Sequence, residues 1–154
     1  MRHLPFLILV ATMFLLPAQA QTTGIPGFND YTIAGAGSGS TSCTALTFTS
    51  PVVLNFQVSA SGPGLPVFAV VSNLPCSPGA FSPFTCQGTT FDLVFTPGII
   101  VTPLGVTGPG GVVSVPVAVP PLITPITFAT QCVVVDPGCA GLPLFTQAYD
   151  VFIL

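Results

Sequence analysis

Apolar side chains alternate with polar or small ones along much of this chain, and a period of two residues is the period of a β-strand. In one run Leu54, Phe56 and Val58 fall on one face, while Asn55 and Gln57 fall on the other. The same alternation recurs at residues 91–95, 113–119 and 149–153. Further apolar runs complete the set of expected strands, at residues 45–49, 67–72, 99–104 and 126–135.

Proline and glycine separate these runs and leave little room for helices. The chain contains 18 Pro and 16 Gly, shows no helical periodicity, and lacks Glu and Lys, which favour helices. We therefore predict an all-β fold: a single antiparallel β-sandwich, Ig-like or jelly-roll-like, with about eight short strands. Pro116 lies inside one of the runs. Because proline has no N–H to donate, it predicts an edge strand there.

The first residues have the pattern of a secretory leader. Arg2 and His3 precede an apolar run at residues 4–16, and a small-x-small motif ends at Ala20. The run is shorter than the ~20 residues that a spanning helix needs, and a retained N-terminal anchor is the alternative. We predict a signal peptide at residues 1–20, cleaved after Ala20, and a secreted protein that is extracellular or attached to the cell surface.

Behind the leader, residues 21–42 are rich in Gly, Ser and Thr, and we expect them to form a flexible lead-in. Residues 43–154 form the predicted sandwich domain. A second long apolar stretch, residues 112–135, contains four prolines, which a helix in a bilayer would not tolerate. We therefore expect β-structure there, and a protein that is not an integral membrane protein after cleavage.

Five cysteines follow the leader, which fits an oxidising compartment and leaves at least one of them without an intrachain partner. Local spacing favours the bridges Cys76–Cys86 and Cys132–Cys139, because each would close a short loop with a Pro-Gly turn. Cys43 is then a free or intermolecular thiol, although other pairings stay open on sequence alone. There is no C-x-x-C pair, and the one histidine lies in the leader, so we expect no metal site and no cofactor.

Charged side chains are almost absent from the chain. Its basic residues belong to the predicted leader, and its acidic residues are four Asp. Nucleic-acid binding depends on Lys and Arg, so we expect no nucleic-acid partner. Catalysis by Ser, Thr or Cys needs a base, and the Asp are scattered, so we expect no enzyme. We place Asp92 and Asp150 on polar strand faces, where they would keep the chain soluble.

The predicted loop between Cys76 and Cys86 carries Phe81 and Phe84, which either form a contact surface or fold back as a small satellite core. A surface with so few charges favours neutral or apolar partners, including further copies of the chain and cell-envelope polymers. We predict a structural or interaction module of the cell surface or extracellular matrix, without catalysis. The alternative is a carbohydrate-binding or other ligand-binding module, for which two Tyr and no Trp are sparse stacking side chains.

Several features together resemble a known group of proteins: Cys43 behind a Gly-rich lead, a Pro-led strand at residues 51–56, Cys76, Cys86, and above all the final segments 126–136 and 148–154. From about Cys43 onward, the chain is similar to uncharacterised exported β-sandwich proteins that occur as paralogues in planctomycete-type bacteria. Cys132 and Cys139 depart from the pattern of that group. The resemblance implies export and a sandwich whose last two strands pair, and it implies no activity.

Overall fold

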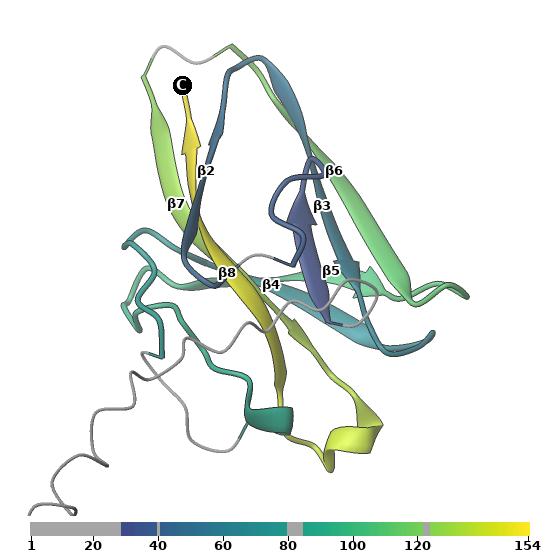
Figure 1. The fold of residues 1–154 in the computed structure, drawn as a ribbon. Helices are drawn as coiled ribbons and strands as arrows, with labels where there is room; N and C mark the ends of the chain where they lie inside the picture. Colours follow the sequence, from purple (N-terminus) through teal and green to yellow (C-terminus); the bar gives the residue numbers. More distant parts are fainter. Residues whose placement is uncertain (1–28, 40, 80–84, 122–123) are drawn as a thin grey trace, which may run out of the picture.

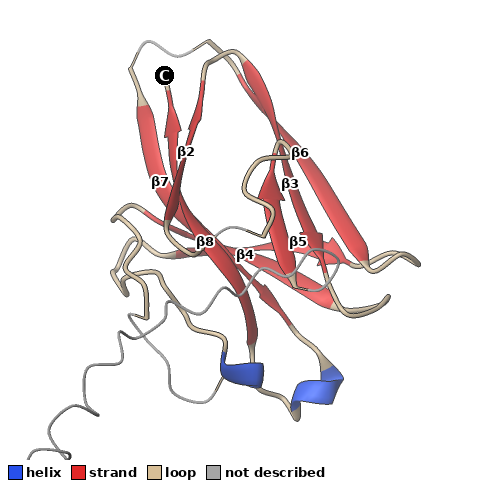
Figure 2. Cartoon of the chain, in the orientation of Figure 1, coloured by secondary structure: helices blue, strands red, loops and turns tan. Residues whose placement is uncertain are grey.

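The computed structural model describes residues 29–39, 41–79, 85–121 and 124–154, which form eight β-strands in two sheets (Figure 1). The predicted all-β sandwich is confirmed. In these ranges the only helical elements are two short 3₁₀ turns, η1 (Cys86–Gly88) and η2 (Pro137–Cys139), drawn in blue in Figure 2, and no helix could span a membrane. The strands are β1 (Asp30–Ile33), β2 (Thr44–Phe48), β3 (Val52–Ser59), β4 (Pro66–Ser72), β5 (Ile100–Val106), β6 (Val112–Val119), β7 (Ile126–Val134) and β8 (Leu144–Ile153).

The strand order distinguishes the two predicted kinds of sandwich. One sheet has the order β1-β3-β6 and the other has the order β2-β8-β7-β4-β5. An immunoglobulin-type sandwich places strands A, B and E in one sheet and strands G, F and C in the other. The sets β1-β3-β6 and β8-β7-β4 reproduce that division, so the fold is Ig-like. It is not wholly antiparallel, because β2 runs parallel to β8, whereas the other pairs are antiparallel.

The strand register puts the alternating apolar residues between the sheets. Across β3 and β6, Leu54 lies opposite Val117 and Val58 lies opposite Val113. Leu54 and Val58 are buried in a core cluster that also contains side chains of β1, β4, β7 and β8. The predicted inner faces of β3 and β6 are therefore confirmed. β6 is the outer strand of its sheet, as Pro116 predicts.

Of the runs predicted as strands, residues 91–95 are the exception. Burial does not alternate along this segment, since Phe91, Asp92 and Leu93 are all buried while Phe95 is 65% exposed. The backbone of Asp92 also bonds outside any ladder: its N–H donates to Gln131 Oε1 at 2.9 Å, and its carbonyl accepts from the N–H of Ser77 at 2.7 Å. The predicted strand and its predicted polar face are therefore wrong, and the segment belongs to a loop.

β1 lies inside the predicted flexible lead-in and was missed. It pairs with β3, and its Tyr31 is fully buried. In the turn that follows, Gly37 has φ +92° and lies so close to Tyr149 that a Cβ atom there would be 2.6 Å from the ring. The flexible lead-in is therefore wrong for residues 29–39, where glycine permits a tight turn over a core aromatic. Residues 1–28, with the predicted signal peptide at 1–20, lie outside the described residues.

The two disulfides join Cys43 to Cys76 and Cys86 to Cys139, across 33 and 53 residues. The free cysteine is Cys132, which is fully buried. The predicted bridges Cys76–Cys86 and Cys132–Cys139 and the predicted free Cys43 are therefore wrong. Local spacing misled because Cys132 sits within β7, with its side chain in the core between the sheets. Two disulfides indicate an oxidising environment.

Candidate functional site

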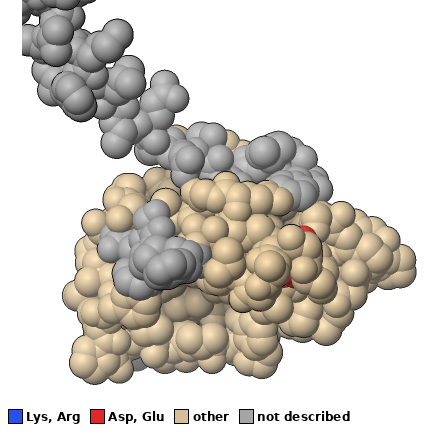
Figure 3. All heavy atoms as spheres, turned by 90° about the horizontal axis from the view of Figure 1, so that it is seen from below, with Lys and Arg blue, Asp and Glu red and all other residues tan. Residues whose placement is uncertain are grey.

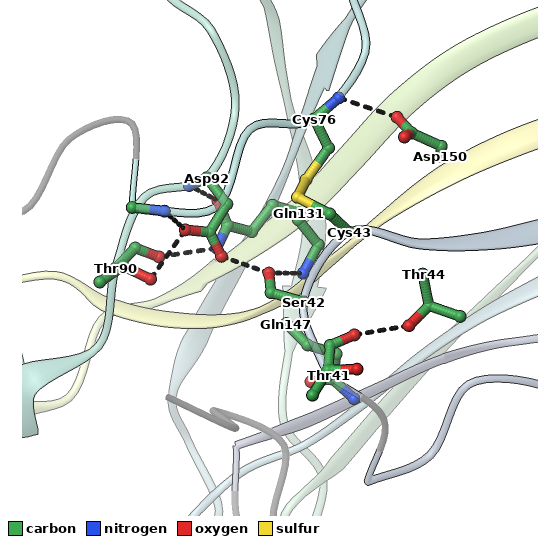
Figure 4. Close-up of a disulfide and its surroundings, with 12 residues drawn as sticks. Thr41, Ser42, Cys43, Thr44, Cys76, Thr90, Asp92, Gln131, Gln147 and Asp150 are labelled. Atoms are coloured by element: carbon green, nitrogen blue, oxygen red, sulfur yellow. Dashed lines mark hydrogen bonds between the residues drawn. A yellow bond between two sulfur atoms is a disulfide. The ribbon is translucent and has the colours of Figure 1, made fainter. Parts of the chain in front are cut away.

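The connection from β4 to β5, residues 73–99, crosses the outer face of the five-stranded sheet. We call it the outer loop; its described parts are 73–79 and 85–99. Cys76 ties it to Cys43, next to the start of β2 (Figure 4), and Cys86 ties it to Cys139 in η2. Between the loop and the sheet lies a second apolar cluster, formed by Val70, Phe91, Leu93, Ala129, Phe145 and Ala148.

The side chain of Gln131 in β7 holds the outer loop to the sheet by hydrogen bonds. The side chain is fully buried, and its Nε2 donates to the carbonyls of Thr90 and Thr146 at 2.8 Å each. Its Oε1 accepts from the N–H of Asp92 at 2.9 Å. One amide thus satisfies three buried backbone groups, two of them in the outer loop, and such groups are costly to leave without partners.

The carboxylate of Asp92 joins parts of the outer loop to one another and to Ser42, which precedes β2. It accepts from the N–H of Gly79 at 2.7 Å, from Thr90 Oγ1 at 2.8 Å and from Ser42 Oγ (Figure 4). Ser42 Oγ in turn accepts from the N–H of Ala148 at 2.9 Å. Asp92 is fully buried, so its predicted place on a solvent-facing strand surface is wrong. A buried carboxylate needs several donors, and the loop supplies them.

The other three carboxylates also accept hydrogen bonds within the chain. Asp30 accepts from Gln147 Nε2 at 2.6 Å, Asp136 from the N–H of Gly138 at 2.8 Å, and Asp150 from the N–H of Cys76 at 2.8 Å. Asp150 lies on the outer face of β8, as predicted, where it is half-buried and also anchors the outer loop. The face in Figure 3 is almost entirely neutral, with only small red areas. Within the described ranges, no group of three or more His, Cys, Asp or Glu could hold a metal ion.

An apolar hollow of about 460 Å³ opens where the outer loop meets β4 and β5. The ring of Phe91 lies 4.8 Å from that of Phe95 and 5.2 Å from that of Phe145, so the aromatic side chains form one continuous wall. None of the lining side chains can donate or accept a hydrogen bond. They are Phe68, Val70, Phe91, Phe95, Ile99, Val101, Val133, Pro143 and Phe145.

The aromatic residues that line the hollow are not the ones that the sequence analysis proposed as a contact surface. Phe81 and Phe84 lie outside the described residues; of the outer loop's described part, Phe91 and Leu93 pack on the sheet. Phe91 and Phe95, which the sequence placed in a strand, form part of the hollow instead. The sequence could not have assembled this site, because its walls come from the outer loop and from four strands, β4, β5, β7 and β8, that are distant along the chain.

Cys132 and Tyr31 lie together in the core between the sheets. The Tyr31 hydroxyl lies 3.3 Å from Thr130 Oγ1. Burial raises the pKa of the Cys132 thiol, and it holds the pKa of the Tyr31 hydroxyl well above its ordinary value. Because the thiolate is the reactive form of cysteine and the Cys132 side chain is fully buried, we expect this thiol to be unreactive in the folded protein.

We expect iodoacetamide to leave the native protein unlabelled at about pH 8. After unfolding without a reductant, one cysteine should react, and peptide mass mapping should place the label on Cys132. Labelling of Cys43, or reaction of the native protein at the rate of a free thiol, would contradict the disulfide pattern and the burial described here.

Comparison of this chain with protein-family models, with curated proteins and with solved structures finds no match. The candidate site is therefore interpreted from its own geometry and chemistry.

Proposed function

We propose that this protein is an exported interaction module of the cell surface or extracellular matrix, without catalytic chemistry, and that it binds an uncharged, apolar group of its partner in the hollow beside the outer loop. One observation carries the proposal: every side chain around the hollow is apolar, and four of them are Phe. A concave apolar site of several hundred Å³ suits a ligand or partner group of the same character.

The way the hollow is held supports this proposal. Its loop wall is fastened by Cys43–Cys76 and Cys86–Cys139, and by the hydrogen bonds of Gln131. A wall that is already ordered loses little conformational entropy when a partner arrives, which leaves more of the contact energy for affinity.

The charge distribution favours a neutral partner. The four carboxylates accept hydrogen bonds within the chain, and the mature protein has no Lys or Arg if the leader is cleaved as predicted. A carbohydrate-binding module is the alternative. Sugar recognition combines aromatic stacking with hydrogen bonds to hydroxyl groups, and the hollow supplies only the aromatic part, so the apolar partner is favoured.

Export is part of the proposal and rests on separate support. The predicted leader, the resemblance to exported sandwich proteins and the oxidising environment indicated by two disulfides agree with one another.

Titration with a neutral apolar fluorophore, N-phenyl-1-naphthylamine, tests the hollow. We expect the wild-type protein to bind it and Phe95→Ala to bind it about tenfold more weakly, because an exposed aromatic wall is lost without disturbing the core. Val53→Ala is the matched control, since Val53 is 58% exposed but lies on β3, away from the hollow. Equal binding by the two variants would contradict the assignment of the site.

Binding to isolated cell envelopes tests the role of the module. We expect the wild-type protein to be retained, Phe95→Ala to be released, and Val53→Ala to behave as the wild type. If neutral oligosaccharides compete for the wild-type protein at the same site, the carbohydrate-binding alternative replaces the apolar one.

A further inference from the structure

β5 and β6 are the last strands of their sheets, and they border the same side of the sandwich. The turn at residues 107–111 joins them, and a Cβ atom on Gly105 of β5 would lie 3.4 Å from Val113 of β6. An immunoglobulin-type sheet of strands A, B and E usually continues into strand D. In the described part of this chain, the sheet stops at β6.

Where that fourth strand would lie, the interior of the sandwich is open. A groove of about 270 Å³ is lined by side chains from both sheets, among them Phe56 of β3, Leu104 of β5, Val117 of β6 and Phe128 of β7. Val117 shares the inner face of β6 with Val113, and yet it is 44% exposed. The groove is therefore uncovered core, and apolar side chains from outside would complete it.

The two rims of the groove are neutral and apolar. Ile100 and Val106 of β5 are exposed, and neither strand contains a charged residue. Each strand instead has a proline, Pro103 in β5 and Pro116 in β6, which removes one backbone donor. Edge strands without charges are normally prone to unlimited pairing, and proline is one of the devices that interrupts it.

We propose that a second copy of this chain covers the groove, so that two open sides meet in a closed, two-fold homodimer. The groove needs apolar side chains to cover it, and the rims carry such side chains. Exposed Ile and Val side chains of one copy can pack into the groove of the other. Like charges would oppose contact between two copies of one surface, but neither β5 nor β6 contains a charged residue. The prolines favour side-chain packing over continuous sheet extension, and an interface of this self-complementary kind closes at two copies.

Sedimentation velocity of the mature protein, with both disulfides intact, tests the dimer between about 1 and 100 µM. We expect a concentration-dependent monomer–dimer equilibrium. Val117→Asp and Thr102→Asp each place a carboxylate in the groove, one on each sheet, and each should weaken the dimer about tenfold or more. Val53→Asp, on the outer face of the three-stranded sheet, should leave the dimer unchanged.

The second groove variant keeps the test decisive if Val117→Asp does not fold, because Thr102 is exposed and contributes little to the core. A wild-type protein that stays monomeric over the whole range would overturn the proposal, as would groove variants that dimerise like Val53→Asp. The homodimer does not depend on the function proposed above: the fluorophore titration reports on Phe95, which lies outside the groove, so the two proposals can fail separately.

Discussion

Replacing Cys86 and Cys139 together by alanine is expected to lower the free energy of unfolding by about 4 kcal/mol, because the bridge between them restricts a loop of this length in the unfolded chain. The sequence separation is 53 residues, compared with ten for the pair that local spacing favoured. The double variant should also lose fluorophore binding, since the bridge fastens the outer loop that walls the hollow. Urea unfolding followed by circular dichroism measures the change in stability.

Cys132→Ala is the control for this experiment. It removes a buried sulfur atom but leaves both bridges, so we expect a cost of only about 1 to 2 kcal/mol and unchanged fluorophore binding. Mapping of disulfide-linked peptides provides an independent check. A Cys76–Cys86 peptide in the native protein, or equal losses of stability in the two variants, would show that the long-range bridge is not the one that forms.

Gln131→Leu is expected to lower the free energy of unfolding by about 3 to 5 kcal/mol, although leucine has a similar volume and suits an apolar environment. The substitution leaves the N–H of Asp92 and the carbonyls of Thr90 and Thr146 buried without their partners. Since two of these groups belong to the outer loop, we also expect that loop to exchange its amide hydrogens faster. Denaturant unfolding and hydrogen exchange measure the two effects.

Gln57→Leu makes the same chemical change on the opposite side of the molecule. Gln57 lies on the polar face of β3 and is only partly buried, so we expect its replacement to change stability by about 0.5 kcal/mol or less. If both variants lost similar stability, or if Gln131→Leu were neutral, the loop would be held by apolar contacts alone and the hydrogen bonds of Gln131 would be incidental.

The second prediction depends on how the described part of the chain, which contains no Lys, Arg or His, provides partners for its buried polar groups. In most proteins Lys and Arg accompany buried carboxylates, but here hydroxyl groups, side-chain amides and backbone N–H groups take that role. Asp92 joins the residues next to β2, the outer loop and, through Ser42, the backbone of β8. The few acidic residues thus fasten loops, and the surface of the described residues carries few charges, which suits contact with neutral partners.

Local sequence patterns predicted much of the sheet structure. The inner faces of β3 and β6 follow from a side-chain period of two, which any strand with one buried face must keep whatever its neighbours are. The edge position of β6 follows from Pro116 for a similar reason, since a missing N–H is tolerated only where no neighbouring strand needs it. These properties are local, so the sequence alone determined them.

The tertiary structure decided which distant segments meet. Disulfide pairing depends on the proximity of side chains in space, and chain distance ranked Cys76–Cys86 above the bridges that form. The strand character of β1, the burial of Asp92 and the walls of the hollow likewise depend on partners far along the chain. A period of two shows that a face is buried but not what covers it, because burial is a property of the packed chain and not of the segment.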